Sequence, residues 1–263
     1  MTDLLERRNT LYRQEGQKIK ALAANLDLVL IVLAGEPRFA PDAISRLMAS
    51  LIEQSIDFQI VLNKADLPEA LATANELIAT FQPVAPCRPW PVVQTSTREP
   101  KGLEALARVL QPLARADDQA CVALVGQSGM GKSSLLNRLV PDAEAQTNAI
   151  STALQSGRHT TTASRVYQAK TEGGLGLQVV DTPGFQRFGI SHLQRDDLER
   201  IFPEWAQISE ELGRCRFVNC SHDHEPDCQI QFKISQLLDS QPAAGQQLES
   251  RRQQWLRLLQ ASS

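Results

Sequence analysis

Several common features are missing from this 263-residue sequence, and each absence removes a class of protein. No apolar run approaches the ~18 residues of a membrane-spanning helix, and the charged N-terminus lacks the apolar core of a secretion signal. Charge of one sign is not in large excess, because 27 Lys and Arg against 30 Asp and Glu leave a net charge of −3. Overall charge therefore gives no reason to expect binding to a membrane or to nucleic acid, and we expect a cytoplasmic protein.

Cysteine is also scarce, at five residues, which is an odd number. Cys215, Cys220 and Cys228 fall in one short segment, whereas Cys87 and Cys121 are expected in the core. In a reducing compartment such clustering favours a metal site over disulfides. The apolar content of 42% is ordinary, and the length allows one large domain or two modest ones.

The clearest motif is G-x-x-x-x-G-K-S at residues 126–133, between an apolar run at 121–125 and an expected helix at 134–140. Strand, glycine-rich loop and helix in this order form a phosphate-binding loop, in which backbone N–H groups and the positive end of the helix dipole face an oligophosphate. Lys132 would reach the outer phosphates, and the Ser133 hydroxyl would bind Mg²⁺. The residues expected to line this part of the nucleotide site are Gly126, Gln127, Ser128, Gly129, Met130, Gly131, Lys132, Ser133 and Ser134.

A second motif, N-K-A-D at residues 63–66, directly follows an expected strand at 58–62. At the end of a strand this pattern reads guanine in GTPases. The Asp66 carboxylate can accept from the guanine N1–H and the exocyclic amine together, a pair that adenine does not offer. Asn63 would contact the base edge, and the Lys64 stem would stack over the ring. A polar turn after a strand is the alternative for these four residues taken alone.

Two later segments are expected to sense the γ-phosphate and Mg²⁺: G-R-H-T-T-T at residues 157–162 and D-T-P-G at residues 181–184. Asp181 would hold Mg²⁺ through water, and the Gly184 N–H would contact the γ-phosphate. An ordinary Thr-rich loop is the alternative for the first segment. The other residues assigned to the nucleotide site are Thr95 and Ser96, in a polar turn after a strand, and Thr160, Thr161 and Thr162, of which Thr161 is the expected Mg²⁺ ligand.

Phe185 occupies the position at which Ras-like enzymes place a Gln that orients the attacking water. Because Phe cannot do this, we expect the polar group to come from the Thr-rich segment, with His159 as the candidate. Lys132 and Thr161 would be the other catalytic residues. The alternative is that His159 contacts only RNA or solvent. Intrinsic turnover would be slow until a bound partner orders the segment.

The order of the motifs is unusual, because N-K-A-D precedes the phosphate loop and D-T-P-G comes last. The same parallel sheet forms if the conventional chain ends are joined and new ends open elsewhere. The apolar run at 27–33 adds a strand buried on both faces. We therefore predict an α/β fold, a P-loop NTPase of the circularly permuted GTPase type with a mainly parallel sheet, over residues 25–190. Residues 1–24 are predicted to be a polar leader or linker.

Residues 191–263 lack this βα pattern and are predicted to form a small helical zinc-binding domain. The spacing C-x4-C-x-H-x5-C brings together Cys215, Cys220, His222 and Cys228. Three thiolates and one imidazole suit tetrahedral Zn²⁺, and four protein ligands make a closed structural site rather than a catalytic one. The alternatives are buried free cysteines, or His224 in place of His222.

Together, the permuted order, G-R-H-T-T-T, D-T-P-G-F and the Cys/His cluster resemble the RsgA (YjeQ) family of ribosome small-subunit-dependent GTPases, over residues 7–263. The resemblance implies GTP and GDP as ligands, with Mg²⁺ and Zn²⁺, and points to His159 as well. It implies late assembly of the small ribosomal subunit, with GTP hydrolysis on the immature particle driving release. The implied partners are the small subunit and its rRNA, and we expect a monomer without membrane association.

The family's design also includes an N-terminal OB-fold, for which the roughly two dozen residues before the first expected strand are too few. We expect the barrel to be missing, which bears on docking to RNA. Two other functions stay open: a nucleotide-gated RNA- or protein-binding module with incidental hydrolysis, and a truncated product that binds GTP without docking. N-K-A-D argues against an ATPase.

Overall fold

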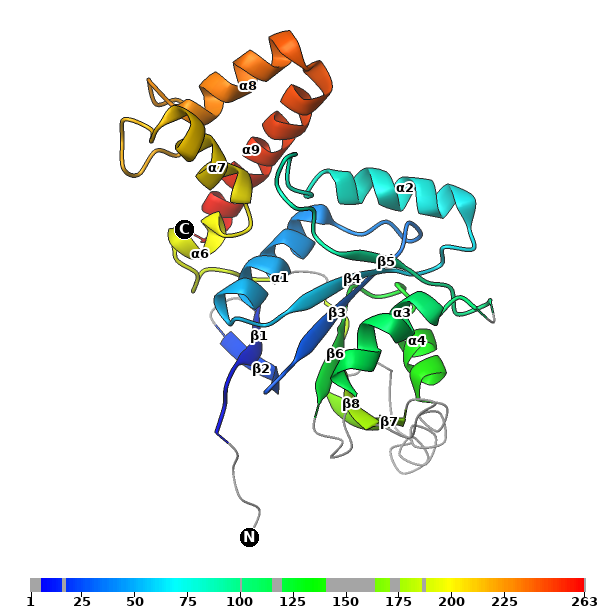
Figure 1. Cartoon of the computed structure of the whole chain (residues 1–263). Coiled ribbons are helices and arrows are strands. Elements are labelled where there is room, and N and C mark those ends of the chain that lie inside the picture. Colours follow the sequence, from blue (N-terminus) through cyan, green and yellow to red (C-terminus); the bar gives the residue numbers. More distant parts are fainter. Residues whose placement is uncertain are drawn as a thin grey trace. The chain divides into compact units, whose positions relative to one another are not determined.

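The computed structural model describes residues 6–15, 18–99, 101–114, 120–140, 164–170, 176–185 and 188–262. Within them the strands are β1 (Thr10–Glu15), β2 (Lys18–Ala24), β3 (Leu28–Leu33), β4 (Phe58–Leu62), β5 (Val92–Gln94), β6 (Cys121–Val125), β7 (Arg165–Lys170) and β8 (Gly176–Asp181). The helices are α1 (Pro41–Glu53), α2 (Pro68–Ala79), α3 (Glu104–Leu110), the 3-10 helix η1 (Gln111–Leu113), α4 (Lys132–Leu139), α6 (Arg195–Glu199), α7 (Pro203–Leu212), α8 (Gln229–Ser240) and α9 (Pro242–Ser262) (Figure 1).

A six-stranded sheet in the order β5-β4-β3-β6-β8-β7 forms the centre of the fold (Figure 1). The first five strands run parallel, and the edge strand β7 runs antiparallel to β8. Every residue of β3 and β6 is buried, as their continuous apolar runs predict for strands covered on both faces. Helices α3 and α4 lie along the same face of the sheet. The predicted α/β fold with a mainly parallel sheet is confirmed.

The strands that precede the three nucleotide motifs end at one edge of this sheet. β4 ends before N-K-A-D, β6 ends before the phosphate loop, and β8 ends at Asp181. β6 lies directly beside β8, and β3 separates it from β4. Since ligands of parallel α/β sheets bind at the carboxyl ends of the strands, the rearranged chain order still brings the motifs to one place.

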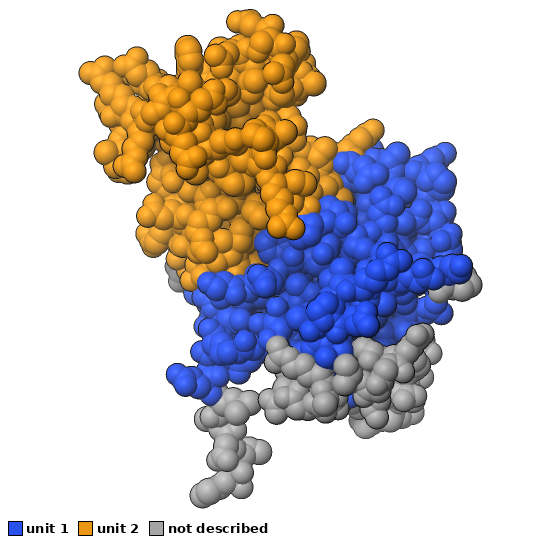
Figure 2. Space-filling view, viewed as in Figure 1, with its two compact units in different colours: residues 1–39, 54–75, 91–187 blue, residues 40–53, 76–90, 188–263 orange. Residues whose placement is uncertain are grey.

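The described residues form two compact units with interleaved sequences (Figure 2). Unit 1 comprises Met1–Phe39, Gln54–Asn75 and Pro91–Arg187, and unit 2 comprises Ala40–Glu53, Glu76–Trp90 and Phe188–Ser263. Unit 1 contains the sheet, and unit 2 contains the C-terminal helices together with α1 and the segment after α2. The sequence predicted boundaries after residues 24 and 190. It did not anticipate that α1 joins unit 2, because periodicity reveals an apolar face but not what packs against it.

Strands β1 and β2 pair with each other antiparallel, in the part of the chain where we expected a leader or linker. Thr10 and Leu11 are buried, and the Thr10 N–H donates to Gln54 Oε1 at 3.0 Å. Asn9 makes hydrogen bonds to both backbone groups of Leu26, at 2.9 and 2.8 Å. The sequence did not predict these strands, because they contain several charged residues and only a few buried positions, so no clear apolar pattern marks them.

In unit 2 the chain forms two successive short helices, α6 and α7, before the cysteine cluster. Pro203 lies in the first turn of α7. Backbone N–H groups in the first turn of a helix have no acceptor within the helix, so proline, which lacks an N–H, is tolerated there and marks the start of a new helix. Helices α8 and α9 approach closely at Gly245, where a Cβ would lie 2.6 Å from the backbone nitrogen of Leu238. Among the described residues, no helix combines the length and apolar character that crossing a membrane requires.

Candidate nucleotide site and metal centre

The phosphate loop joins β6 to α4 and depends on glycine at two points where other parts of unit 1 come close. Gly131 has φ of +90°, and a Cβ there would lie 2.3 Å from Asn63 Nδ2. A Cβ on Gly126 would lie 2.4 Å from the Val32 carbonyl oxygen. The loop is therefore folded tightly against β3 and the guanine motif, and a side chain at either position would displace a neighbour.

Lys132 is buried at the start of α4. Its Nζ donates to the carbonyl oxygens of Gly126 and Gln127 at 2.8 and 3.0 Å, so the ammonium group closes over the loop that contains it. Burial lowers the pKa of Lys132, and the charge of Asp181 acts in the opposite direction. The residues that follow, Ser133 and Ser134, are exposed, which leaves their hydroxyls accessible to a ligand.

Asn63 connects the guanine motif to the phosphate loop. Its Nδ2 donates to the Met130 carbonyl at 3.0 Å, and its Oδ1 accepts from the Thr95 hydroxyl at 3.4 Å. The Asn63 side chain is only 2% exposed. The contact of Asn63 with the base edge stays a prediction. In the structure its amide joins two loops, a role that spacing along the chain does not reveal.

Asp66 is held in place by the turn after β5. The Ser96 hydroxyl donates to its Oδ1 at 2.7 Å, and Arg98 Nη1 lies 3.9 Å from its Oδ2. The Lys64 ammonium donates to the Glu36 carbonyl at 2.7 Å, which fixes the direction of its stem. Sequence reasoning missed Arg98, because it lies outside any motif. Thr95 and Ser96 are both buried, and their support of the base stays a prediction.

Asp181 and Gly184 complete the part of the site that the structure describes. Burial raises the pKa of Asp181, while Lys132 and Arg165 lower it. A Cβ on Gly184 would lie 3.3 Å from Lys132 Nζ and 3.4 Å from the Ser128 backbone nitrogen, so D-T-P-G lies against the phosphate loop. The other predicted site residues, His159, Thr160, Thr161 and Thr162, lie outside the described residues.

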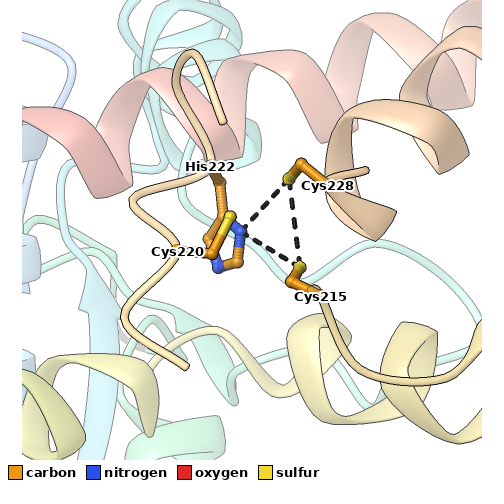
Figure 3. Close-up of side chains that lie close together, drawn as sticks. All are labelled: Cys215, Cys220, His222 and Cys228. Atoms are coloured by element: carbon orange, nitrogen blue, oxygen red, sulfur yellow. Dashed lines mark hydrogen bonds between the residues drawn. The ribbon is translucent and has the colours of Figure 1, made fainter. Parts of the chain in front are cut away.

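Four side chains of unit 2 converge in the way a metal site requires: Cys215, Cys220, His222 and Cys228 (Figure 3). The His222 Nδ1 lies 3.7 Å from the Cys215 sulfur and 3.4 Å from the Cys228 sulfur, and these two sulfurs are 4.0 Å apart. Ligand atoms of tetrahedral zinc are separated by roughly 3.5–3.8 Å, given bonds of about 2.0–2.3 Å. All four ligand atoms, including the Cys220 sulfur, lie within 4.8 Å of one another, so the four groups fit one zinc ion.

Of the two candidate histidines, the structure brings His222 to the cysteines. The His224 side chain is 83% exposed and lies 3.7 Å from Asp223. Burial, followed by the nearby Arg195, lowers the pKa of His222 to about 4, which keeps the imidazole neutral, as a metal ligand must be. Cys87, expected in the core, is half-buried and donates to Gln207, whereas Cys121 is buried as expected.

The loop that carries the metal ligands is fixed by hydrogen bonds to three successive carbonyl groups. Arg195 donates to the Cys220 carbonyl, Trp255 Nε1 donates to the Ser221 carbonyl at 2.9 Å, and Arg252 donates to the His222 carbonyl at 2.9 Å. His222 has φ of +64°, an uncommon conformation for a residue other than glycine. These bonds hold the backbone in the form that aims the imidazole at the sulfurs.

Comparison with known proteins gives a family match over most of the chain. Residues 4–191 match the family model described as RsgA GTPase. A protein of Paraburkholderia xenovorans named small ribosomal subunit biogenesis GTPase RsgA is 43% identical over 232 residues, which are 88% of this chain and 69% of that protein. A protein of Burkholderia pseudomallei (strain 668) with the same name is 45% identical over 230 residues, 88% of this chain and 68% of that protein.

Two solved structures share the fold. YjeQ from Thermotoga maritima aligns with a TM-score of 0.62 at 24% identity, over 99% of this chain and 77% of that one. YloQ, described as a circularly permuted GTPase, aligns with a TM-score of 0.57 at 24% identity, over 100% of this chain and 81% of that one. At this identity the likeness concerns the fold, and it confirms the circularly permuted arrangement.

Proposed function

This chain belongs to the RsgA GTPase family, and from that premise we propose that it hydrolyses GTP as a late assembly factor of the small ribosomal subunit. The observation that carries the proposal is the hydrogen bond from Asn63 to the Met130 carbonyl. It joins a motif that recognises guanine to a loop that binds phosphates, although 67 residues separate them in the chain. A single pocket for a guanine nucleotide is the simplest use of that connection.

Guanine recognition is assigned to Asp66. Its carboxylate would accept from the guanine N1–H and 2-amino groups, and the Ser96 hydroxyl on Oδ1 keeps the carboxylate oriented for this. The Lys64 stem, held at its ammonium end by the Glu36 carbonyl, would form one wall for the ring. Adenine has no N1–H and no 2-amino group to donate, so it would leave the free positions of this part-buried carboxylate unpaired, which is unfavourable.

Phosphate binding is assigned to residues 126–134. Backbone N–H groups of the loop and the N-terminus of α4 would face the β- and γ-phosphates, and Lys132 would exchange its loop carbonyls for phosphate oxygens. Ser133 and Asp181, with Thr161, are the residues that would hold Mg²⁺, which would neutralise charge on the transferring phosphoryl group. Gly184, beside Lys132, would place its N–H at the γ-phosphate.

Activation of water is assigned to His159, outside the described residues. Phe185 is 2% exposed and carries no polar group, and the Thr182 hydroxyl donates to the Leu124 carbonyl at 2.7 Å. These two residues of the D-T-P-G-F segment are therefore not suited to orienting the water. Slow intrinsic turnover, raised when a bound partner places His159, follows from this assignment.

The partner is assigned from the relatives' names. Both curated relatives are named as GTPases of small ribosomal subunit biogenesis, and we extend that role to this chain, with contact to the subunit's rRNA, hydrolysis driving release, and a cytoplasmic location. The four ligands around the predicted zinc leave no position for substrate, so the metal would stabilise the fold of unit 2 rather than take part in hydrolysis.

A turnover assay tests the proposal. Phosphate release from GTP is measured for the full chain alone and with purified small ribosomal subunits, with ATP as the competing substrate. The proposal predicts hydrolysis of GTP but not ATP, raised at least about 10-fold by the subunits. GTP binding without stimulation would favour a nucleotide-gated binding module, and failure to bind GTP would remove the proposal.

A further inference from the structure

One turn of α9 makes two sets of hydrogen bonds inside unit 2. Arg251 and Gln254, each 1% exposed, bond to elements that continue from the guanine site. Arg252 and Trp255 bond to the loop that carries the metal ligands. A five-residue stretch therefore touches two structures to which the sequence assigns different tasks.

The first set is centred on Arg251. Its Nε donates to Glu204 Oε1 at 2.5 Å, its Nη1 donates to the Phe81 carbonyl at 2.9 Å and to Gln254 Oε1 at 2.6 Å, and its guanidinium lies 4.3 Å from the centre of the Phe202 ring. The Gln254 amide donates in turn to the Ser45 hydroxyl. Each of these buried donors of Arg251 and Gln254 has an acceptor. The side chains of Arg251, Gln254 and Phe202 are therefore fixed in one conformation.

Phe81 and Ser45 matter because of where their chain segments come from. Phe81 follows α2, which begins two residues after Asp66. Ser45 lies in α1, which follows β3 and the Glu36 turn whose carbonyl holds Lys64. The chain thus connects the guanine site to the acceptors of Arg251 and Gln254 through α2 on one side and through the start of α1 on the other.

The second set fixes the metal loop. Trp255 Nε1 donates to the Ser221 carbonyl and Arg252 Nη1 to the His222 carbonyl, both at 2.9 Å. Arg252 is itself held by both carboxylate oxygens of Glu249, each at 2.8 Å. Because Ser221 lies between two metal ligands, the position of its carbonyl depends on whether Cys220 and His222 are gathered around an ion.

We propose that the turn of α9 from Arg251 to Trp255 couples the metal cluster to the guanine site, so that zinc and guanine nucleotide strengthen each other's binding. A bound metal fixes the acceptors of Trp255 and Arg252 and so orders the turn. The ordered turn places Arg251 and Gln254 so that they bond to Phe81 and Ser45. These bonds restrain α1 and the segment after α2, which connect to the guanine site along the chain. Linkage requires the two affinities to change by the same factor. The inference rests on the proposed function, since it needs a nucleotide in that site.

The test uses the full chain. The Kd of a fluorescent GDP analogue is measured for zinc-loaded protein and after zinc removal, and the zinc affinity is measured with and without saturating GDP, by competition with a chromogenic chelator. Removing zinc should weaken GDP binding about 5- to 10-fold, near the lower end for coupled sites, and GDP should raise zinc affinity by the same factor. Circular dichroism checks that the helices persist without zinc.

Two conservative variants address the turn itself. Trp255→Phe keeps an aromatic ring but lacks the N–H that bonds the Ser221 carbonyl, and Gln254→Met keeps the side-chain length but lacks the amide that bonds Ser45. Both should reduce the coupling factor to about twofold or less. Gln253→Ala is the matched control, since that exposed side chain bonds Glu249, and it should retain the full factor.

The outcomes separate this inference from the function on which it rests. Equal GDP affinity with and without zinc overturns the coupling and leaves the GTPase proposal intact, as does full coupling in both variants. Failure of the zinc-loaded protein to bind GDP overturns the proposed function and the coupling with it. A factor that falls in Trp255→Phe and Gln254→Met but not in Gln253→Ala supports the role of the turn.

Discussion

The side-chain amide of Asn63 donates to the backbone carbonyl of Met130 at 3.0 Å, and this bond joins the two loops that define the nucleotide site. Met130 is itself 1% exposed, so its carbonyl has little access to water as an alternative partner. Each loop follows a strand of the same sheet, with β3 between them. The sheet therefore sets the distance between the two loops, and the hydrogen bond from the Asn63 amide restrains how they move relative to each other.

Asn63→Ala should weaken GDP binding about 10-fold, because a buried carbonyl left without a donor costs about 1–3 kcal/mol and the phosphate loop would shift to find one. The measurement is the Kd of a fluorescent GDP analogue. Asn9→Ala is the matched control, since Asn9 also bonds backbone groups of unit 1 but lies directly before β1. The control should lower the melting temperature with unchanged GDP affinity; equal affinities in both variants would contradict the assigned role of Asn63.

Gly131→Ala should abolish GDP binding, while Gly213→Ala should not. Both glycines have strongly positive φ, +90° and +87°, with ψ of 22° and 173°, so either substitution introduces backbone strain of about 1–3 kcal/mol, with the larger strain at Gly213. A Cβ at Gly131 would also lie 2.3 Å from Asn63 Nδ2, whereas a Cβ at Gly213 would meet nothing within 4 Å. Thermal unfolding measures the shared strain, and GDP titration isolates the displacement of Asn63. GDP binding by Gly131→Ala with wild-type affinity would contradict the geometry.

Asp66→Asn should change the preferred base. The substitution replaces an acceptor by an amide that can donate, so it disfavours the guanine 2-amino group and favours the carbonyl that xanthine carries at the same position. GTP affinity should fall at least about 100-fold and XTP affinity should rise. Competition binding with GTP, XTP and ATP measures both changes. Ser96→Ala, which removes only the hydroxyl bonded to Asp66, should weaken GTP binding about 10-fold or less without altering the preference.

The parts of the fold that the sequence predicted are those with a local signature. β3, β4 and β6 are apolar runs that a parallel sheet requires, and the polar motifs directly follow strands. The Cys/His spacing likewise predicted the side chains that converge in unit 2. In each case, neighbouring residues carry the whole pattern, so one sequence was sufficient.

The parts that were missed depend on distant residues. Arg251 bonds Glu204 and Phe81, which lie 47 and 170 positions away, and nothing in the local pattern around α9 indicates a buried charge. The bond to Phe81 holds the segment after α2 in unit 2, and the bond from Gln254 to Ser45 does the same for α1, whereas the sequence predicted both in the sheet domain. Arg98, near Asp66, was missed for a related reason, since it belongs to no motif.

His159→Ala should lower subunit-stimulated GTP turnover about 100-fold while leaving GTP affinity within about twofold of wild type, since a residue that positions water acts in the transition state. The assignment depends on Phe185 being buried and on Thr182 being bonded to the Leu124 carbonyl. Single-turnover phosphate release with small subunits measures the effect. Unchanged stimulated turnover would remove His159 from the mechanism and leave the guanine assignments standing.

His222→Ala should release the predicted zinc and lower the melting temperature of the protein, whereas His224→Ala should do neither. The His222 ring lies within 3.7 Å of two cysteine sulfurs, and the exposed His224 lies outside the cluster. Without the imidazole, three thiols would remain in a partly buried site where burial raises the pKa values of Cys220 and Cys228, so the uncharged thiol is favoured. Thiolates bind zinc and thiols do not, and loss of the ion removes folding free energy.

Metal analysis should find one zinc per chain in wild type and His224→Ala and far less in His222→Ala. Full zinc occupancy in His222→Ala would mean that the cluster is closed by another ligand.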